Sequence, residues 1–484
     1  MYSLDEETML ATTRALSHGH RELQVDATNR GVLATHVQRP GERVGQYGLG
    51  TSIVALPLLG AGTLVANASG TTRPEIVVRL FVLWTNSLLT AFAVVLVFLL
   101  ALEIGASSPG AVLLALAYGF GTFAWAHSKT FFSEPGTTVC LLAAVLLVLR
   151  GARTERWQPW FVGGLAAGAS LLFRATAAVG LPVLFVFAAV ASRGLPARAI
   201  ARRLTSLGAG VAVSLVVFGL VNWWRFGSPM TLGYAQVPYD TPLHEGAFGL
   251  LFSTGKGLAW YAPVALLAVA MPFVARSSRH VRAVWLVGAL MAGYLILFGR
   301  YHDWNAGDSW GPRYLQPVTP LLVATLAVVV DQERWRRWIV RVAVVGGTLT
   351  LVAGVATYFN AVTWRDLPRL QAELGQDPTD QSRAATRARA DATNWTPSDS
   401  PILLGVRYFP DAVRNTAEHL AGPRTPLPDT ESQFVHYYDD PLRIDTWWAW
   451  WGPSGGWPPL LLLVPAFVAG AVISGRRLLP MLRS

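Results

Sequence analysis

The chain has 484 residues, of which 52% are hydrophobic and only 14% are charged, and its mean hydropathy is +0.39. Soluble domains carry about one charged residue in four, so this composition excludes a soluble globular protein. The net charge of +10 does not indicate nucleic-acid binding, because basic loops beside a membrane explain it. The single cysteine, Cys140, excludes an intrachain disulfide framework and a cysteine metal site.

Residues 1–78 precede the first long apolar run and are predicted to form an extracytoplasmic loop. Within them, residues 47–68 are apolar but rich in glycine and proline, which predicts one or two helices lying at the membrane surface, with a further span as the alternative. Neither a span nor a signal peptide precedes this loop in the sequence. We therefore expect a first helix to be missing upstream of Met1; the alternative is that the loop crosses the membrane as a tail.

From residue 79 onward, apolar runs long enough to cross a membrane recur along the chain. A helix needs about 20 apolar residues to cross about 30 Å of hydrocarbon, and in lipid it must satisfy its own backbone polar groups. The sequence therefore predicts an all-α, polytopic integral membrane protein with about 11 transmembrane helices. The predicted spans lie near 79–103, 109–126, 135–150, 159–173, 178–193, 205–222, 259–275, 283–299, 314–330, 338–358 and 458–475.

Arginines concentrate in alternate connections between these spans, and cytoplasmic loops are the ones that carry such an excess. Residues 79–358 then form a helical core whose active-site loops face outside. Residues 359–457 are predicted to form an extracytoplasmic subdomain, and 458–484 the last transmembrane helix and a basic cytoplasmic tail. The basic connections are 150–156, 193–203, 276–282 and 334–341.

Two of the predicted outer segments carry acidic residues suited to catalysis. A carboxylate held near the membrane surface can act as a general base, and Asp5 and Glu6 open the first loop; the alternative is N-capping of the helix that follows. The connection 127–135 places Lys129 and Glu134 between two spans. Lys129 suits phosphate oxygens, although it could equally extend its stem along the lipid interface.

Arg174 lies at the outer end of a short span, where a charge calls for a partner. An anionic lipid headgroup would serve, and so would Glu134. Lys256 stands between two glycines at a predicted helix start, a setting that attracts anions, but the leading glycine of a Walker A loop is missing. The connection 299–320 is dense in polar and aromatic groups, with a structural salt-bridge cluster as the alternative to a binding site; it contains Arg300, His302, Asp303, Asp308, Arg313 and Tyr314.

These segments, in this order, resemble the GT-C superfamily of membrane glycosyltransferases, and most of all the family 39-like, phospholipid-carrier-dependent enzymes of bacteria. The resemblance covers most of residues 1–330 and is weak in 359–457. The segments that carry it are SLDEETM, YGLGTSIVALPLLG, YGFGTFAWAHSKTFFSEP, NWWRFGSPMTLGY, FSTGKGLAWYAP and WGPRYLQPVTP.

The resemblance implies transfer of a sugar from a polyprenyl-phosphate donor to an acceptor hydroxyl of a cell-envelope glycan, lipid or protein, outside the cytoplasm and with inversion. Asp5 stands where the family has its proposed base, with Glu6 beside it and Glu134 as a further candidate acid. Cations would hold the leaving phosphate. Some relatives use a divalent metal, for which the sequence assigns no ligands. The candidate substrate-binding residues are Lys129, Arg174, Lys256, His302, Asp303, Arg313 and Tyr314.

Two other functions are compatible with many spans. A transporter or lipid flippase usually shows internal repeats or paired broken helices, and neither is evident here. A non-enzymatic scaffold of the same fold would be indistinguishable in sequence. The sugar, the acceptor and the length of the lipid carrier are not fixed by any motif that we find.

Overall fold

The structure, a computed structural model, describes residues 3–23, 34–36, 43–71, 74–234, 238–307, 309–357, 359–377, 382–421, 442–445, 469–470 and 472–474. Apart from one short antiparallel pair, β1 (Ala34–His36) with β2 (Arg43–Gly45), the regular elements in these ranges are helices. The predicted class, an all-α polytopic membrane protein, is confirmed.

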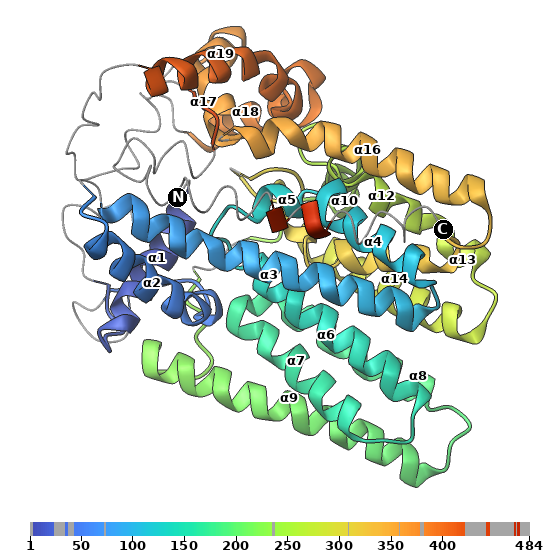
Figure 1. The fold of residues 1–484 in the computed structure, drawn as a ribbon. Helices are drawn as coiled ribbons and strands as arrows, with labels where there is room; N and C mark the ends of the chain where they lie inside the picture. Colours follow the sequence, from blue (N-terminus) through green and yellow to red (C-terminus); the bar gives the residue numbers. More distant parts are fainter. Residues whose placement is uncertain are drawn as a thin grey trace.

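Three helices form the N-terminal part of the molecule: α1 (Leu4–Ser17), α2 (Gly50–Ala68) and α3 (Pro74–Ile104). Helix α1 begins after Ser3, whose hydroxyl accepts a hydrogen bond from the Glu6 N–H, as an N-cap does. Helix α2 packs against both α1 and α3 (Figure 1). Most of the predicted helical region 47–68 is thus one continuous helix, α2, which begins at Gly50 and has Pro57 inside it.

The helices after α3 follow the order of the predicted spans, and further helices come after the last of them in the part of the chain that the structure describes. The remaining elements are α4 (Ser108–Gly121), α5 (Ala124–His127), α6 (Glu134–Arg153), α7 (Gln158–Phe173), η2 (Ala175–Val179), α8 (Gly180–Ala191), α9 (Ala197–Phe226), α10 (Leu243–Phe252), α11 (Leu258–Tyr261), α12 (Pro263–Leu266), η3 (Leu267–Ala270), α13 (Met271–Val274), α14 (Ser278–Gly299), η4 (Arg313–Leu315), α15 (Thr319–Thr325), η5 (Leu326–Val328), α16 (Arg334–Ala356), α17 (Phe359–Glu373), α18 (Arg383–Trp395), η6 (Pro397–Asp399) and α19 (Pro401–Ala421).

Within the described residues, five helices are long and apolar enough to cross a membrane: α2, α3, α6, α9 and α14. Several other predicted spans fall on shorter apolar helices, namely Ser108–Gly121, Ala175–Ala191, Pro263–Val274 and Thr319–Val328, whereas the predicted span 338–358 falls on α16, which has 23 residues. The run 259–275 is divided into α11, α12 and α13, and its first break is at Ala262 (φ −154°, ψ 60°). The cause is Pro263, because a proline disfavours the helical conformation of the residue before it. Most of the predicted span 458–475 lies outside the described residues.

The helices of the core pack side by side, and α17, α18 and α19 form a separate group beside them (Figure 1). Helices α7 and α9 approach closely through glycines. A Cβ on Gly164 would lie 2.1 Å from the Leu207 carbonyl oxygen, and one on Gly210 would lie 2.0 Å from that of Phe161. Small residues permit such contact between helices in lipid, where close packing replaces the hydrophobic effect.

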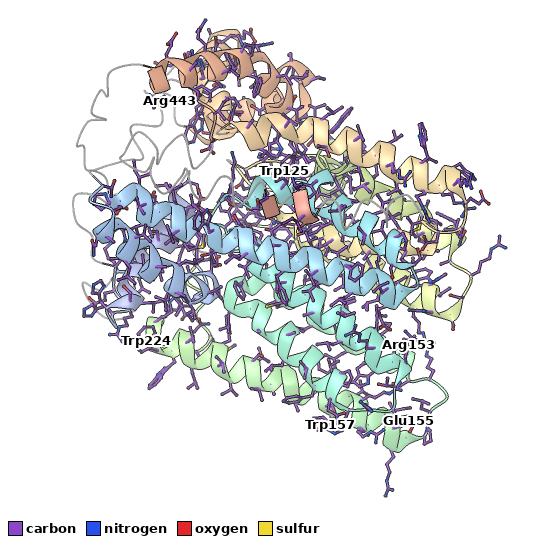
Figure 2. All side chains as sticks on the ribbon, in the orientation of Figure 1. Trp125, Arg153, Glu155, Trp157, Trp224 and Arg443 are labelled. Atoms are coloured by element: carbon purple, nitrogen blue, oxygen red, sulfur yellow. The ribbon has the colours of Figure 1, made fainter. Side chains whose placement is uncertain are left out.

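Exposed tryptophans mark both ends of this packed pair. Trp157 precedes α7 and is 47% exposed, and Trp224 lies near the end of α9 and is 39% exposed. They lie far apart on the molecule (Figure 2). Tryptophan is enriched at both membrane–water interfaces, so the two positions fit the two faces of a bilayer.

Candidate active site

The start of α6 and the end of α7 meet at one end of the bundle. A Cβ on Gly136 would lie 2.1 Å from the ring of Phe173, so only glycine permits this approach. The contact brings Glu134, the first residue of α6, to Arg174, which follows α7. Arg174 Nη1 donates to Glu134 Oε1. Of the two partners predicted for Arg174, the structure therefore provides Glu134.

Arg313 joins this pair to the first segment of the chain. Its Nη1 donates to Asp5 Oδ2 at 3.1 Å, and its Nε lies 3.4 Å from Glu134 Oε1. We call Asp5, Glu134, Arg174 and Arg313 the acid–arginine cluster. Two carboxylates face two guanidinium groups in it, so the formal charges balance. Balance matters because an unpaired charge is costly to bury.

Exposure differs across the cluster. The Glu134 side chain is 1% exposed and that of Arg313 is 9% exposed, whereas Asp5 is 25% exposed. Burial by itself lowers the pKa of Arg313, but Glu134 and Asp5 raise this pKa well above its ordinary value. Arg313 therefore stays charged, and Asp5 is the carboxylate that a ligand can reach most readily.

Tyr47 supports Asp5 from the other side. Its hydroxyl donates to Asp5 Oδ1 at 2.6 Å. Burial and the neighbouring Asp5 raise the pKa of Tyr47 above its ordinary value, so the phenol keeps its proton and acts as a donor. A Cβ on Gly48 would lie 2.3 Å from the Leu172 carbonyl oxygen, which means that this glycine lets the Tyr47 loop press against the end of α7.

Aromatic rings surround the two arginines. The Arg313 guanidinium lies 4.3 Å from the centre of the Phe132 ring, and that of Arg174 lies 5.0 Å from the Tyr314 ring. Tyr314 in turn stacks on Phe298 at 4.3 Å with an interplanar angle of 14°. Cations over aromatic faces are stabilised by the ring quadrupole, so Tyr314 helps to form the wall of the acid–arginine cluster; its role in substrate binding stays a prediction.

Tyr234 lies at the open edge of the same region. Its ring meets that of Tyr47 edge-on at 5.8 Å, and it is 38% exposed. Neither Tyr47 nor Tyr234 was assigned a role from sequence. Both stand in segments that carry the family resemblance, beside glycines, but nothing distinguishes a tyrosine that supports a carboxylate from one that packs in a core.

Glu6 has a different environment from Asp5. It is fully buried, and its Oε1 accepts a hydrogen bond from the Phe131 N–H at 2.6 Å. This contact ties α1 to the connection before α6. Glu6 therefore helps to hold the site together, and its catalytic role stays a prediction without geometric support.

Lys256 is bound by carbonyl oxygens. Its Nζ donates to the oxygens of Gly307 and Ser309, each at 2.6 Å, and it is 5% exposed. The neighbouring Gly255 N–H donates to the Asn394 oxygen, so this amide also has a partner. In this structure Lys256 fixes the 299–313 connection, which ends at Arg313. Its predicted contact with phosphate stays untested.

Lys129 lies outside the acid–arginine cluster. Its Nζ donates to the carbonyl oxygens of Val355 and Thr357 and to Asp445 Oδ2, each at 2.8 Å. It thus caps the end of α16 and joins it to a much later part of the chain.

Two histidines near the site have different surroundings. His127 is fully buried, and its Nε2 lies 2.9 Å from the Trp310 oxygen; burial holds its pKa near about 3, so it is neutral. His302 meets the ring of Tyr301 at 4.6 Å. Asp303 shows no ion pair in the part of the chain that the structure describes, and Asp308 lies outside that part. The described residues contain no group of three histidine, cysteine, aspartate or glutamate side chains that could hold a metal ion.

Comparisons with known proteins give a structural likeness only. No family model matches the chain, and no curated protein matches it. Among solved structures, it is similar to ArnT from Cupriavidus metallidurans in the apo state, with a TM-score of 0.45 and 12% identity over 91% of this chain and 81% of that one. It is also similar to ArnT of the same organism bound to undecaprenyl phosphate, with a TM-score of 0.47 and 14% identity over the same shares of the two chains.

Proposed function

We propose that this membrane protein is a glycosyltransferase that moves a sugar from a polyprenyl-phosphate donor to an acceptor hydroxyl at the extracytoplasmic face of the plasma membrane. The observation that carries the proposal is the bridge that Arg313 makes between Asp5 and Glu134. Segments from three distant parts of the chain meet there, and they supply both kinds of group that the reaction needs.

Asp5 is the base in this proposal. The acceptor oxygen attacks the anomeric carbon, and the carbon–oxygen bond to the donor phosphate breaks. The electron pair leaves with the polyprenyl phosphate, and the acceptor proton passes to Asp5. Tyr47 and Arg313 hold one carboxylate oxygen each, which fixes its orientation. A direct displacement of this kind inverts the anomeric centre.

Arg174 and Arg313 are suited to the leaving group. A guanidinium presents a planar fork of donors that matches phosphate oxygens, and charge grows on the leaving phosphate in the transition state. Both arginines already meet Glu134. A bound phosphate would contact the same two arginines as Glu134 does, so we assign to Glu134 the role of positioning their guanidinium groups.

The remaining predicted residues are placed further from this chemistry. His302 and Asp303 belong to the connection that carries Arg313 and Tyr314, and Lys256 contacts this connection at Gly307 and Ser309. We propose that these three residues shape the pocket for the donor or acceptor. Lys129 would reach a phosphate only by leaving its three oxygen partners. A divalent metal also stays a proposal, and we assign no residues as its ligands.

The position of the cluster favours a transferase over a transporter. Transporter sites usually lie near the bilayer midplane on broken helices, whereas Glu134 and Arg174 stand at the terminal residues of their helices. A non-enzymatic scaffold would have no need for a reachable carboxylate held between a phenol and a guanidinium.

The proposal is tested with the full chain in reconstituted vesicles, given a polyprenyl-phosphate sugar labelled in the sugar. We expect labelled product and free polyprenyl phosphate in equal amounts, with the anomeric configuration of the product inverted. Movement of intact donor between leaflets without cleavage would indicate a transporter instead. Donor binding without any turnover, over a panel of hydroxyl acceptors, would favour the scaffold.

A further inference from the structure

A second charged site lies at the far end of the bundle from the acid–arginine cluster. Glu134 and Arg153 are the first and last residues of α6, which has 20 residues, and a helix of that length spans about 30 Å. Helix α3 ends at Ile104, and α14 begins at Ser278, beside Arg153. Three helices that are long enough to cross a membrane therefore end together here.

The Glu103 carboxylate pairs with two arginines at this end of the bundle. Its side chain is 11% exposed, and its oxygens lie 2.7 Å from Arg153 Nη1 and 3.3 Å from Arg150 Nε. Arg279 donates instead to neutral acceptors, the backbone oxygens of Glu103 and Leu102. These contacts pair two backbone oxygens at the end of α3. In the described residues Arg279 makes no ion pair with a carboxylate.

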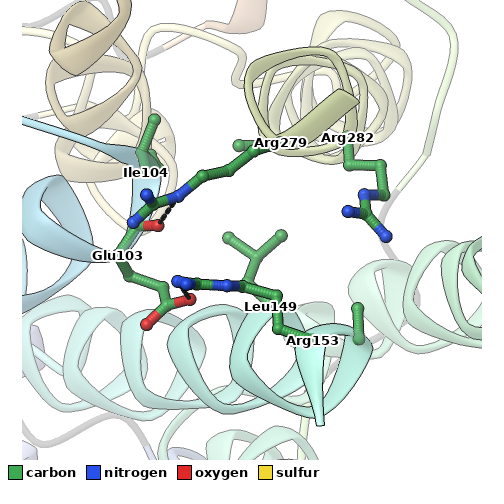
Figure 3. Close-up of a pocket in the computed structure, with 8 residues that line it drawn as sticks. Glu103, Ile104, Leu149, Arg153, Arg279 and Arg282 are labelled. Carbon is green, nitrogen blue, oxygen red and sulfur yellow. Dashed lines mark hydrogen bonds and ion pairs between the residues drawn. The ribbon is translucent and has the colours of Figure 1, made fainter. Parts of the chain in front are cut away.

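Arg282 stands across the pocket from Glu103 (Figure 3). Its Nε donates to the backbone oxygen of Ser278, one turn earlier in its own helix. Within the described part of the chain Arg282 makes no ion pair. The group as a whole therefore has a clear excess of positive charge, and its one carboxylate is already engaged by two arginines.

These side chains line a shallow pocket whose enclosed space is about 10 Å³, about the room that one water molecule needs. Arg153, Arg279 and Arg282 supply the polar rim, and Ile104 and Leu149 belong to its apolar wall (Figure 3). Sites for whole drug-sized ligands measure about 300–1,000 Å³, so a ligand would contact the arginine rim at the mouth of this pocket and would not enter it.

We infer that the arginine rim of this pocket binds the phosphate of an anionic phospholipid headgroup. Two observations select this occupant. The rim lies where helices that are long enough to cross a membrane end, and its excess charge is positive. Basic pockets between transmembrane helices are known to take anionic headgroups. A zwitterionic headgroup would bring an amine for which the pocket has no free carboxylate.

The alternative is that these arginines only set the orientation of the helices in the membrane. In that case any arginine on this face should matter equally for lipid binding. Arg198 offers a matched control, because it is exposed and lies at the start of α9, away from the pocket residues. Arg282→Gln and Arg198→Gln remove the same charge.

The test measures lipid retention by the full-length protein, using native mass spectrometry with phosphatidylglycerol and phosphatidylcholine of identical chains. We expect preferential retention of phosphatidylglycerol, and a loss of about fivefold in its affinity in Arg282→Gln, as for one arginine near an anionic surface. Arg198→Gln should bind as the wild type does. Equal losses in both variants would overturn the inference.

Two further arms complete the experiment. Soluble glycerol 3-phosphate should bind far more weakly than phosphatidylglycerol; equal affinity would overturn the assignment to a lipid. If Arg282→Gln does not fold, Arg153→Gln replaces it, because Arg153 is 47% exposed and Glu103 keeps its contact with Arg150. Unchanged phosphatidylglycerol affinity in a folded Arg153→Gln protein would count against the site.

Discussion

Arg313 Nη1 lies 3.1 Å from Asp5 Oδ2, across a separation of 308 residues in the chain. The pair joins the first helix of the chain to the segment that begins at Arg313, beside the start of α6 and the end of α7. It also couples the proposed base to one of the two cations proposed for the leaving phosphate. Changes at either residue should therefore affect both chemistry and the order of the surrounding loops.

Glu134 and Arg174 should behave as one energetic unit. Glu134→Gln or Arg174→Gln alone leaves a buried charge without its partner, and we expect each to lower the free energy of unfolding by about 3–5 kcal/mol. The double variant should lose less than the sum of the two, with a coupling of about 0.5–3 kcal/mol in a double-mutant cycle. Additive losses would show that the contact contributes nothing.

Lys256 should prove important to stability as well as to binding. Lys256→Ala leaves the carbonyl oxygens of Gly307 and Ser309 buried without their donor, which costs about 1–3 kcal/mol. We expect a lower thermal midpoint together with weaker donor binding, since the loop that carries Arg313 is loosened. A variant that binds donor poorly yet melts like the wild type would instead support a direct contact between Lys256 and phosphate.

Gly164 should be required for the contact between α7 and α9. Alanine there would put a Cβ 2.1 Å from the Leu207 oxygen, so the helices must separate and the thermal midpoint should fall. Gly288→Ala is the control, because a Cβ at Gly288 has nothing within 4 Å. Alanine is the better helix former, and this control should melt at the same temperature as the wild type or higher. Equal melting of the two variants would contradict the close packing.

His127 should make the protein less stable in mild acid. Its pKa is held near about 3 in the folded chain and is about 6.5 when unfolded. The stabilisation is complete above pH 6.5 and falls as the pH drops towards 3, by up to about 1.4 kcal/mol per pH unit. His127→Gln should flatten this dependence between pH 6.5 and 5, whereas a substitution at the exposed His18 should not. An unchanged slope in His127→Gln would show that His127 does not cause it.

Much of the architecture could be predicted from hydrophobic run lengths, because the bilayer sets a physical length for each helix. The breaks were harder to place. Pro263 divides a run that composition alone presents as continuous. Arg174 could be assigned an acidic partner, because a charge at that depth needs one, and Glu134 was among the two candidates named.

The rest of the site depends on contacts between distant segments, which a single sequence does not contain. The charge of Lys129 suggested contact with phosphate oxygens. In the fold Lys129 contacts Asp445, which lies 316 residues later in the chain. Lys256 looked like an anion-binding residue because of its flanking glycines, and in the fold those glycines serve close packing. Tyr47 gave no signal that it would hold Asp5.

The most direct measurement of the central claim is the turnover number of Asp5→Asn in reconstituted vesicles, with donor affinity measured separately. Asparagine keeps the size of the side chain but cannot take the acceptor proton. We predict that turnover falls by about 10²–10⁴-fold while donor affinity is retained, and that Glu22→Gln, an exposed acid in the same segment, has no effect. Near-normal turnover in a folded, correctly inserted Asp5→Asn protein would contradict the account and direct attention to Glu134 or Glu6.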